Sequence, residues 1–588
     1  MKQFKEYKQL NLSQVADEIL AQWESEDLFT QSVKTREGHT PFLFFEGPPS
    51  ANGKPGIHHV LARTIKDTFC RYKTMQGFEV RRKAGWDTHG LPVELGVEKM
   101  LGITKEDIGK KISVDEYNAA CRKEVMKYTA EWTDLTKKMG YWVDLDNPYI
   151  TYNNKYIESL WYLLSELYKK GYLYKGYTIQ PYSPAAGTGL SSHELNQPGC
   201  YRDVKDLTCT VRFHITGTTR YVIAWTTTPW TLPSNTALCV GPKIDYVEVQ
   251  QDGYSIILAE ARLDAYKKEL CATDADGNLL EPTIIWRGKG QELVGLHYDQ
   301  LFPWVNPGEG AFRIIPGDYV TTEDGTGIVH IAPTFGADDK KVADAAGVPG
   351  LYMQTKEQGP RPMVDFTGKY WLPEELDEAW YKQNVNASLY ERYAGRWVKN
   401  AYDPQFTVDG KYDEAAAAKA ETLDLHLCLE MKQDGRMFRT EKHVHTYPHC
   451  WRTDKPVLYY PLDSWFIRST KAREEMIRLN NTINWQPEST GTGRFGKWLE
   501  NLNDWNLSRS RYWGTPLPIW RTEDGKEEIC IGSIAELFAE IDKSVKAGFM
   551  KANPWPKFKV GDYSAANYDP SVIDLHRPYV DDIILVSP

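Results

Sequence analysis

The chain has 588 residues, of which 41% are hydrophobic, and a formal net charge of −10. This length and composition are typical of a globular protein with about three to four domains that each hold a hydrophobic core. No stretch approaches the ~18 apolar residues of a membrane-spanning helix, and the N-terminus lacks the apolar core of a signal peptide. We therefore expect a cytoplasmic protein without membrane contacts. The nine cysteines form no Cys-x-x-Cys pair, which predicts reduced thiols and no zinc site.

A strand, a loop, a helix and a second strand are predicted in order near the N-terminus. Residues 41–46 (PFLFFE) are almost wholly apolar, which is typical of a strand buried on both faces. A Gly/Pro-rich loop follows at 47–56, and apolar residues then recur at helical spacing until Gly77. An extended stretch at 78–83 leads into a turn at 85–90. This βαβ order places both loops at one edge of a parallel sheet, where open α/β folds bind ligands.

Two adjacent histidines, His58 and His59, lie at the first turn of the predicted helix. Free backbone N–H groups and the positive end of the helix dipole favour anions there, and an imidazole can donate to a phosphoryl oxygen as charge builds. The alternative is a pair that only caps the helix. A P-loop is excluded, because Gly53-Lys54 is followed by Pro55 rather than by Ser or Thr.

Residues 47–67 (GPPSANGKPGIHHVLARTIKD) and 85–94 (GWDTHGLPVE) resemble the catalytic core of class I aminoacyl-tRNA synthetases of the isoleucine, valine and leucine subgroup. In that family the first loop ends in a His-x-Gly-His signature that cradles ATP. His59 aligns with the last histidine, whereas Gly56 stands at the first histidine and His58 at the glycine. The resemblance implies that His59 contacts phosphate, and our hypothesis is that His58 substitutes for the missing imidazole.

The resemblance also implies an ATP site and an amino-acid pocket at these loops. Asp87 is expected to pair with the substrate ammonium, because a desolvated ion pair is stronger than an exposed one. The alternative for Asp87 is an Asx-type turn that only shapes its loop. ATP is expected as its Mg²⁺ complex. The residues implied are Asn52, Gly53, Gly56 and His59 for ATP, His58 and His59 for catalysis, and Pro48, Asp87 and Trp513 for isoleucine.

Three later segments resemble the inserted editing domain of isoleucyl-tRNA synthetases: 225–235 (WTTTPWTLPSN), 324–333 (DGTGIVHIAP) and 336–339 (GADD). Thr228 stands where valine and leucine enzymes usually have arginine. The alternative for the threonine run is a β-strand whose hydroxyls satisfy their neighbours. The resemblance implies a pocket for the misacylated tRNA end that is formed by Thr226, Thr227, Thr228, Asn235, His330 and Asp339.

Such residues suit the hydrolysis of an aminoacyl ester, which needs an ammonium anchor, a positioned water and donors for the oxyanion. We expect Asp339 to be the anchor, and the threonine hydroxyls and His330 to orient the water. Poor discrimination between isoleucine and valine by a single pocket is an established property of this enzyme class, and it explains why a second, hydrolytic site is required.

The catalytic half resumes in residues 504–520 (DWNLSRSRYWGTPLPIW). Arg509 and Arg511 in this segment are expected in surface ion pairs rather than on tRNA. The family's Lys-Met-Ser-Lys-Ser loop does not occur in the 588 residues, and its helical anticodon-binding domain is not expected here. We therefore expect a fragment with little ATP–pyrophosphate exchange, because the triphosphate lacks its lysine clamp.

The expected fold class is α/β, a Rossmann-type parallel-sheet catalytic domain interrupted by a β-rich inserted editing domain. The expected partners are tRNA(Ile), isoleucine and ATP, and a monomer is expected. The predicted domains are an N-terminal helical segment (1–40), the first half of the catalytic domain (41–198), the editing insertion (199–440) and an incomplete second catalytic half (441–588).

Three alternatives remain at this point. A valine or leucine enzyme is opposed by Thr228 and its sequence context. A stand-alone hydrolase that edits mischarged tRNA is favoured by the missing segments and opposed by the retained catalytic motifs. A dinucleotide-binding oxidoreductase is opposed because no Gly-x-Gly-x-x-Gly turn follows a predicted strand.

Overall fold

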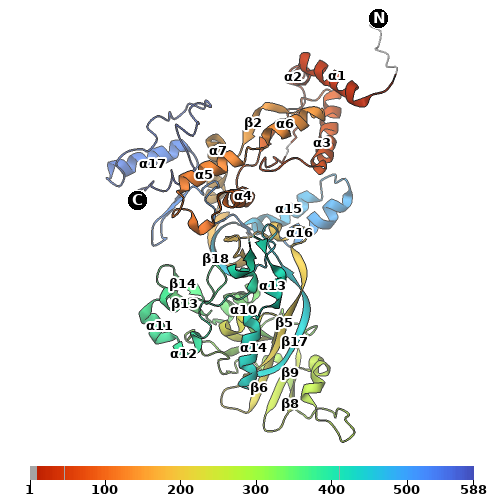
Figure 1. Cartoon of the computed structure of the whole chain (residues 1–588), viewed down its shortest axis with the longest axis vertical. Coiled ribbons are helices and arrows are strands. Elements are labelled where there is room, and N and C mark those ends of the chain that lie inside the picture. Colours follow the sequence, from red (N-terminus) through yellow and green to blue (C-terminus); the bar gives the residue numbers. More distant parts are fainter. Residues whose placement is uncertain (1–8, 45–46, 409–410, 588) are drawn as a thin grey trace. The chain divides into compact units, whose positions relative to one another are not determined.

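The computed structural model describes residues 9–44, 47–408 and 411–587. The chain divides into two compact units, which are described separately below (Figure 1). Unit 1 comprises residues 1–173 and 511–588, and unit 2 comprises residues 174–510. Across the described ranges, none of the helices combines the length and the apolar character that a bilayer crossing requires.

Unit 1 is mainly helical, with one pair of parallel strands and one hairpin. Its strands are β1 (Lys83–Trp86), β2 (Asp144–Ile150), β20 (Ile519–Arg521) and β21 (Glu528–Cys530). Its helices are α1 (Leu12–Ser25), α2 (Leu28–Lys34), α3 (Ile57–Met75), α4 (Leu91–Leu101), α5 (Val114–Glu124), α6 (Thr129–Lys138), α7 (Asn154–Lys169) and α17 (Ile534–Lys546). β1 and β2 pair in parallel, but they are not the pair of the βαβ prediction, which named residues 41–46 and 78–83.

The strand predicted at 41–46 is wrong in its described part. Pro41 makes a single parallel bridge with Glu79, and Leu43 is 74% exposed. Residues 45 and 46 lie outside the described residues. In the described residues 40–44 and 78–83, this pairing comprises two backbone hydrogen bonds, Phe42 N–H to Glu79 O and Glu79 N–H to Thr40 O, both 3.0 Å long. The run is apolar, but its described residues have no continuous partner strand. They therefore do not form a buried strand.

The predicted helix after the first loop is confirmed as α3, and Gly77, with φ of +90°, follows its end. A residue with positive φ is the usual way to terminate a helix, and glycine adopts it without strain. The apolar residues that predicted this helix are exposed, while the residues buried along α3 are Arg63, Cys70 and Thr74. The hydrophobic pattern therefore located the helix correctly and its buried face wrongly.

Unit 2 is built around a nine-stranded mixed sheet with the order β10-β8-β9-β6-β12-β7-β11, in which β5 pairs with β6 and β17 pairs with β5. The strands of this sheet are β5 (Tyr201–His214), β6 (Arg220–Thr226), β7 (Ala237–Val240), β8 (Asp245–Gln250), β9 (Ser255–Ala259), β10 (Ile284–Lys289), β11 (Arg313–Pro316), β12 (Ile328–Ile331) and β17 (Met437–Pro448). Figure 1 shows β5 and β17 as long neighbouring strands, and their antiparallel register runs from Tyr201 opposite Pro448 to Val211 opposite Met437.

The other elements of unit 2 are short or peripheral to this sheet. The smaller sheets contain β3 (Leu173–Ser183), β4 (Thr188–Gly189), β13 (Tyr352–Thr355), β14 (Gly359–Pro362), β15 (Thr407–Val408), β16 (Lys411–Tyr412), β18 (Leu458–Ile467) and β19 (Trp505–Asn506). The helices are α8 (Ser192–Leu195), α9 (Lys267–Leu270), α10 (Ala337–Ala346), α11 (Glu378–Asn384), α12 (Ala387–Tyr390), α13 (Glu414–Lys419), α14 (Leu423–Gln433), α15 (Arg473–Asn480) and α16 (Gly496–Glu500).

One large hydrophobic core holds unit 2 together, and aromatic side chains dominate it. Phe213 from β5 and Trp230, Phe302, Trp304 and Tyr370 from the segments around the sheet are at most 3% exposed. Burial of each such ring stabilises the fold by about 1.5–3 kcal/mol relative to an exposed ring. Unit 2 contains the predicted insertion 199–440, and the domain boundaries themselves stay predictions.

Candidate functional site

The two loops predicted to bind substrate meet in unit 1, and we call loops 47–56 and 85–90 together the two-loop site. The Asp87 N–H donates to the Pro49 carbonyl at 3.0 Å. The Trp132 indole N–H, from α6, donates to the Gly53 carbonyl at 2.8 Å, and its ring lies 6.5 Å from that of Trp86. The phosphate-side loop is therefore fixed against both the end of β1 and α6.

His59 has a defined orientation at the N-terminus of α3. The Gly56 N–H donates to His59 Nδ1 at 2.9 Å, so the neutral ring carries its proton on Nε2. The His59 ring lies 3.8 Å from His58 and 4.7 Å from Trp132. Burial, together with the neighbouring His58 and Arg63, lowers the pKa of His59. His59 is therefore a neutral hydrogen-bond donor at neutral pH.

His58 is exposed and lies beside Gly56, where the family signature has its first histidine. A Cβ atom added at Gly56 would lie 2.8 Å from His58 Cε1, which is too close for any real contact. The His58 ring therefore fills the space into which a side chain at position 56 would project. Asn52 and Gly53, predicted to contact ATP, lie on the loop leading to this helix; Asn52 is half-buried and Gly53 is exposed.

Asp87 projects from a turn whose other groups are fixed. Its carboxylate accepts backbone N–H groups of Thr88 and His89, and these contacts only partly offset the desolvation that raises the pKa of Asp87. The Thr88 N–H donates to Thr151 Oγ1 at 2.9 Å, and Thr88 is fully buried. The Asp87 side chain itself is exposed, and Pro48 on the facing loop is half-buried.

Trp513, predicted as a wall of the isoleucine pocket, is 0% exposed. Its indole N–H donates to the Thr88 carbonyl at 2.6 Å, and its ring stacks on His576 with centroids 4.7 Å apart and an interplanar angle of 8°. Its backbone N–H donates to Glu94 Oε1 at 2.7 Å. The structure thus places Trp513 behind the Asp87 turn with no open face, and its direct contact with substrate stays a prediction.

A second site in unit 2, which we call the threonine cavity, has a volume of about 390 Å³. It lies where β6 and β12 end and α10 begins. Five of the six predicted editing residues line it, namely Thr226, Thr227, Thr228, His330 and Asp339, together with Trp225, Thr231, Tyr319, Phe335 and residues 324–329. The sequence segments 225–235, 324–333 and 336–339 therefore come together as the resemblance implied.

His330 is held through both of its ring nitrogens. The Asn235 amide N–H donates to His330 Nδ1 at 3.2 Å, so Nε2 carries the proton and donates to Thr231 Oγ1 at 2.9 Å. Thr231 in turn donates to the Thr228 carbonyl at 2.8 Å. Burial lowers the pKa of His330 to about 4. His330 is therefore neutral and fixes the threonine turn, rather than being a free base.

Asp339 is the acidic group of the threonine cavity and lies in the first turn of α10. Its carboxylate accepts the Ala332 N–H at 2.9 Å. A Cβ atom at Gly336 would lie 2.5 Å from the Asp339 carboxyl carbon, so only glycine at 336 permits this approach. Burial raises the pKa of Asp339 to about 7, with a smaller contribution from Asp338. A desolvated carboxylate of this kind is stabilised by a bound cation.

Sequence reasoning missed three residues that support the threonine cavity. Thr231 lies within the quoted motif, and the three-residue spacing from Thr228 was the signal for its contact across a single helical turn. Tyr298 donates its hydroxyl to Asn235 Oδ1 at 2.7 Å, and Asp424 accepts the Trp230 N–H at 2.8 Å. Tyr298 and Asp424 are distant in sequence and lie outside every quoted motif, so no sequence signal pointed to them.

Arg509 and Arg511 both form ion pairs, as expected, but the surface location expected for them is wrong for Arg511. Arg509 pairs with Glu194 at 3.0 Å in unit 2. Arg511 pairs with Glu94 at 2.9 Å in unit 1, where both side chains are at most 5% exposed. A buried pair of this kind is strongly coupled, because removing either partner leaves an uncompensated charge.

No group of three or more His, Cys, Asp or Glu side chains is arranged to hold a metal ion within residues 9–44, 47–408 and 411–587. The prediction that this part of the protein carries no zinc is not tested by that observation.

Residues 18–566 match the family model of class I tRNA synthetases (I, L, M and V), and the chain belongs to this family. The expected α/β fold class, with parallel strands and a large β-rich insertion, agrees with this membership. The chain is 64% identical over 620 residues to Isoleucine--tRNA ligase of Bacteroides thetaiotaomicron, covering 100% of this chain and 53% of that protein. It is 64% identical over 608 residues to Isoleucine--tRNA ligase of Bacteroides fragilis, covering 100% of this chain and 52% of that protein. The chain thus spans about half the length of these relatives.

Among solved structures, the chain is similar to LeuRS in the ternary complex of Agrobacterium radiobacter K84 agnB2 LeuRS, tRNA and LeuAMS. The sequence identity is 15%, the TM-score is 0.33, and the match covers 90% of this chain and 52% of that chain.

Proposed function

We propose that this chain carries the synthetic and editing sites of an isoleucine–tRNA ligase. Such an enzyme forms isoleucyl-adenylate from isoleucine and ATP, transfers the isoleucyl group to tRNA(Ile), and hydrolyses mischarged valyl-tRNA(Ile). The observation that carries the proposal is 64% identity along the whole chain to relatives named Isoleucine--tRNA ligase. The proposal concerns the two-loop site and the threonine cavity of this chain.

The N-terminus of α3 supports binding of the ATP phosphates at the two-loop site. Its first backbone N–H groups have no partner within the helix and attract anions. His59 presents a proton on Nε2, because Gly56 occupies Nδ1. That N–H can stabilise the charge that builds on the phosphoryl oxygens while the isoleucine carboxylate displaces pyrophosphate. ATP would enter as its Mg²⁺ complex, with the metal as part of the substrate.

The position of His58 supports its role as a substitute for the first signature histidine. The ring lies in the space of a side chain at position 56, so the imidazole is supplied from two residues later in the chain. The variant His58→Gly should weaken ATP binding about tenfold, since one hydrogen bond to a charged group is lost. The double variant G56H/H58G recreates the His-x-Gly-His order and should restore affinity. Unchanged affinity in the single variant would contradict this role.

The exposed Asp87 carboxylate supports binding of the substrate ammonium. Two backbone N–H groups orient it, and desolvation already raises its pKa. A bound ammonium would place a positive charge beside this carboxylate and stabilise its ionised form. Recognition of the aliphatic side chain then depends on shape, for which Pro48 on the facing loop provides a rigid apolar surface.

The threonine cavity supports hydrolysis of valyl-tRNA(Ile). Asp339, with its raised pKa and its backbone donor, fits the ammonium of the aminoacyl ester. The hydroxyls of Thr227 and Thr228 line the same cavity and can orient a water molecule toward the ester carbonyl. His330 contributes by holding the threonine turn, because both of its nitrogens are occupied. No acyl-enzyme is needed in this scheme.

Two measurements on this chain test the proposal. Calorimetry with a non-hydrolysable ATP analogue present should show tighter binding of isoleucine than of valine or leucine. Deacylation of valyl-tRNA(Ile) should exceed that of isoleucyl-tRNA(Ile). Tighter binding of valine or leucine would identify a relative of different specificity, and deacylation without any binding of ATP or amino acid would identify a stand-alone editing hydrolase. A cytoplasmic location and a monomeric state remain expectations of the same proposal.

A further inference from the structure

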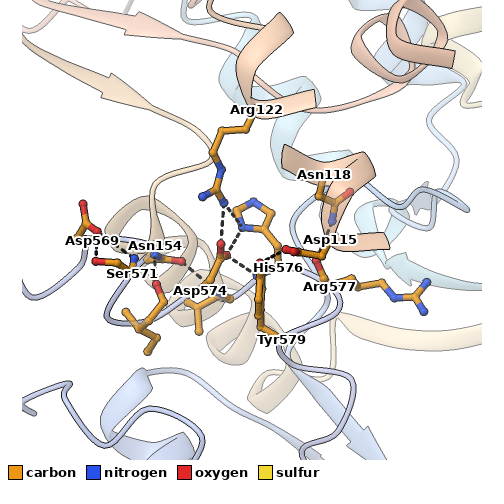
Figure 2. A network of polar contacts seen from close by, with 12 residues as sticks. Asp115, Asn118, Arg122, Asn154, Asp569, Ser571, Asp574, His576, Arg577 and Tyr579 are labelled. Atoms are coloured by element: carbon orange, nitrogen blue, oxygen red, sulfur yellow. Dashed lines mark hydrogen bonds and ion pairs between the residues drawn. The ribbon is translucent and has the colours of Figure 1, made fainter. Parts of the chain in front are cut away.

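A chain of hydrogen bonds runs behind the two-loop site and joins the two ends of unit 1. Arg122 from α5 pairs with Asp574 at 2.8 Å, and Asp574 Oδ1 lies 2.6 Å from His576 Nδ1. His576 Nε2 lies 2.9 Å from His89 Nε2, on the residue that follows Asp87 and Thr88. Figure 2 shows Arg122, Asp574 and His576 turned toward one another. We call Arg122, Asp574, His576 and His89 the relay.

The C-terminal segment that carries the relay is fixed by two buried asparagines (Figure 2). Asn154 donates to the carbonyls of Tyr568 and Ile573 at 3.1 and 2.6 Å, and accepts the Leu575 N–H at 3.0 Å. Asn118 donates to the carbonyl of Arg577 at 2.7 Å. These contacts occur on both sides of His576 in sequence, so the backbone that presents its ring has no freedom to shift.

Hydrogen-bond geometry determines the tautomer of each ring in the relay. His576 Nδ1 faces Asp574 Oδ1 at 2.6 Å and the Arg122 guanidinium at 3.4 Å. The shorter contact is to the carboxylate, which can only accept, so we assign the proton to Nδ1, and His576 Nδ1–H donates to Asp574. In this tautomer His576 accepts at Nε2, and His89 donates through its own Nε2–H. The Nδ1 atom of His89 is left unprotonated. Burial, followed by His576 and Arg122, holds the pKa of His89 well below its usual value, which keeps this ring neutral.

The relay contacts the Asp87 turn from two directions. His576 stacks on Trp513, whose indole N–H donates to the Thr88 carbonyl at 2.6 Å. The His89 ring lies edge-on to Trp513 with centroids 5.0 Å apart. The side chain of Thr88 is engaged by Thr151. In residues 87–89, the Asp87 side chain is therefore the one that faces solvent.

We propose that the relay is a positioning device for the amino-acid site: Arg122 and Asp574 set the tautomer and orientation of His576, which holds His89 and Trp513 and thereby fixes the Asp87 carboxylate. Arg122, Asp574, His576 and His89 are positioning residues, since none of them is placed to touch the substrate. The inference rests on the proposed isoleucine site, and it adds that affinity for the ammonium depends on a segment far away in sequence.

The variant Asp574→Asn tests the relay with little change of shape. Arg122 can only donate, so the amide oxygen at position 574 should stay on Arg122 and the amide N–H should face His576 Nδ1, although the His576 backbone N–H then loses its acceptor. The amide donor moves the ring proton to Nε2 and reverses the donor and acceptor between the two rings. Asp569→Asn is the matched control, because Asp569 lies in the same segment and bonds only its neighbour Ser571 among the contacts drawn in Figure 2. ¹⁵N NMR of the imidazoles reports both tautomers, and variants of His89 and His576 assign the signals.

The expected result is reversed tautomers and about tenfold weaker isoleucine binding in D574N, with unchanged ATP-analogue binding and with D569N like the parent chain. Unchanged tautomers in folded D574N, or unchanged isoleucine affinity with reversed tautomers, would overturn the proposal. If D574N does not fold, His576→Phe carries the test: it keeps a ring on Trp513, and equal isoleucine affinity in that variant would equally overturn the proposal.

The NMR measurement separates this inference from the proposed function. Reversal of the tautomers in a chain that binds no isoleucine would reject the isoleucine site and also the positioning role, while the hydrogen-bond order of the relay would stand. A parent chain that binds isoleucine and a D574N variant that binds it equally well would reject the relay alone.

Discussion

The threonine cavity and the two-loop site are held rigid in different ways. In the cavity, His330 is fixed by Thr231 and Asn235, which lie 99 and 95 positions away in the segment between β6 and β7 of the same unit. In the two-loop site, His89 is fixed by His576, 487 positions away. The cavity is thus supported by the segments that also form its lining. The two-loop site depends on a contact that forms only after distant parts of the chain have assembled, which is entropically harder to nucleate.

The largest effect is expected from Glu94→Gln in unit 1. Glu94 pairs with Arg511 and accepts the N–H groups of Tyr512 and Trp513, all in a buried environment. Loss of the carboxylate leaves an uncompensated guanidinium and should lower the unfolding free energy of unit 1 by about 3–5 kcal/mol. Hydrogen exchange measures this, and amides of β5 and β17 in unit 2 should keep their protection.

Glu124→Gln is the control for that variant, because Glu124 pairs with Lys127 in a partly exposed i,i+3 contact. Its expected effect is about 0–1 kcal/mol. If E94Q lost hydrogen-exchange protection equally in both units, the two units would not unfold separately. That result would contradict the view that the two sites are stabilised independently.

Asp339→Ala should act on the threonine cavity alone. Removing the partner of a desolvated ammonium reduces deacylation of valyl-tRNA(Ile) about 100-fold or more, while isoleucine binding at the two-loop site stays at the parent level. Asp338→Asn, at the exposed neighbouring position, should leave deacylation within about twofold of the parent value. Retained deacylation in D339A would remove the proposed ammonium anchor.

The pH dependence of stability gives a second test of the cavity. The pKa of Asp339 is raised to about 7, above its ordinary value of 3.8, so the folded state holds a proton that the unfolded state has lost between these values. Its contribution to stability is complete below the lower value and is lost as pH rises through the higher one. As pH rises from about 4 to about 7, the Tm of D339N should therefore increase relative to that of the parent, and the difference should be constant above about pH 8. A Tm difference that is constant over the whole range would contradict the raised pKa.

The smallest effect is expected from Thr231→Val. This change removes the acceptor of His330 Nε2–H and the donor to the Thr228 carbonyl while keeping the shape of the side chain. We expect about tenfold slower deacylation and a loss of about 1 kcal/mol in stability. The related change Thr322→Val, at a position outside the cavity lining, should have little effect on either quantity. Equal rates in T231V and the parent would show that the histidine is held adequately by Asn235.

Sequence motifs predicted which segments meet at the two sites better than they predicted the surrounding packing. The threonine run, His330 and Asp339 share one cavity because motif residues that lie at strand ends converge in a mixed sheet. The prediction of a buried strand at 41–46 was wrong for the described residues, because apolar composition does not show whether a partner strand is available. The same is true of α3, whose hydrophobic spacing fixed the helix and not its buried face.

Roles that depend on long-range contacts were not accessible from the sequence. Nothing in the segment around Trp513 indicates that its ring is enclosed by His576 and His89. Similarly, the motif identifies His330 as a site residue, yet its engagement at both nitrogens follows from Asn235 and Thr231 in three dimensions. A motif thus specifies which residue types are present, while tautomers and hydrogen-bond directions are set by the fold.

The pairing of β5 with β17 has a consequence for how such a chain is assembled. Next to the end of this strand pair, the His449 N–H donates to the Cys200 carbonyl at 2.7 Å. The two residues that flank the 248-residue segment 201–448 are therefore in direct contact. A module whose two ends meet in this way can be acquired, enlarged or exchanged without stretching the polypeptide on either side of it. The antiparallel stem therefore makes the β-rich portion portable, and a short peptide joining residues 200 and 449 should suffice to close the gap if that portion is excised.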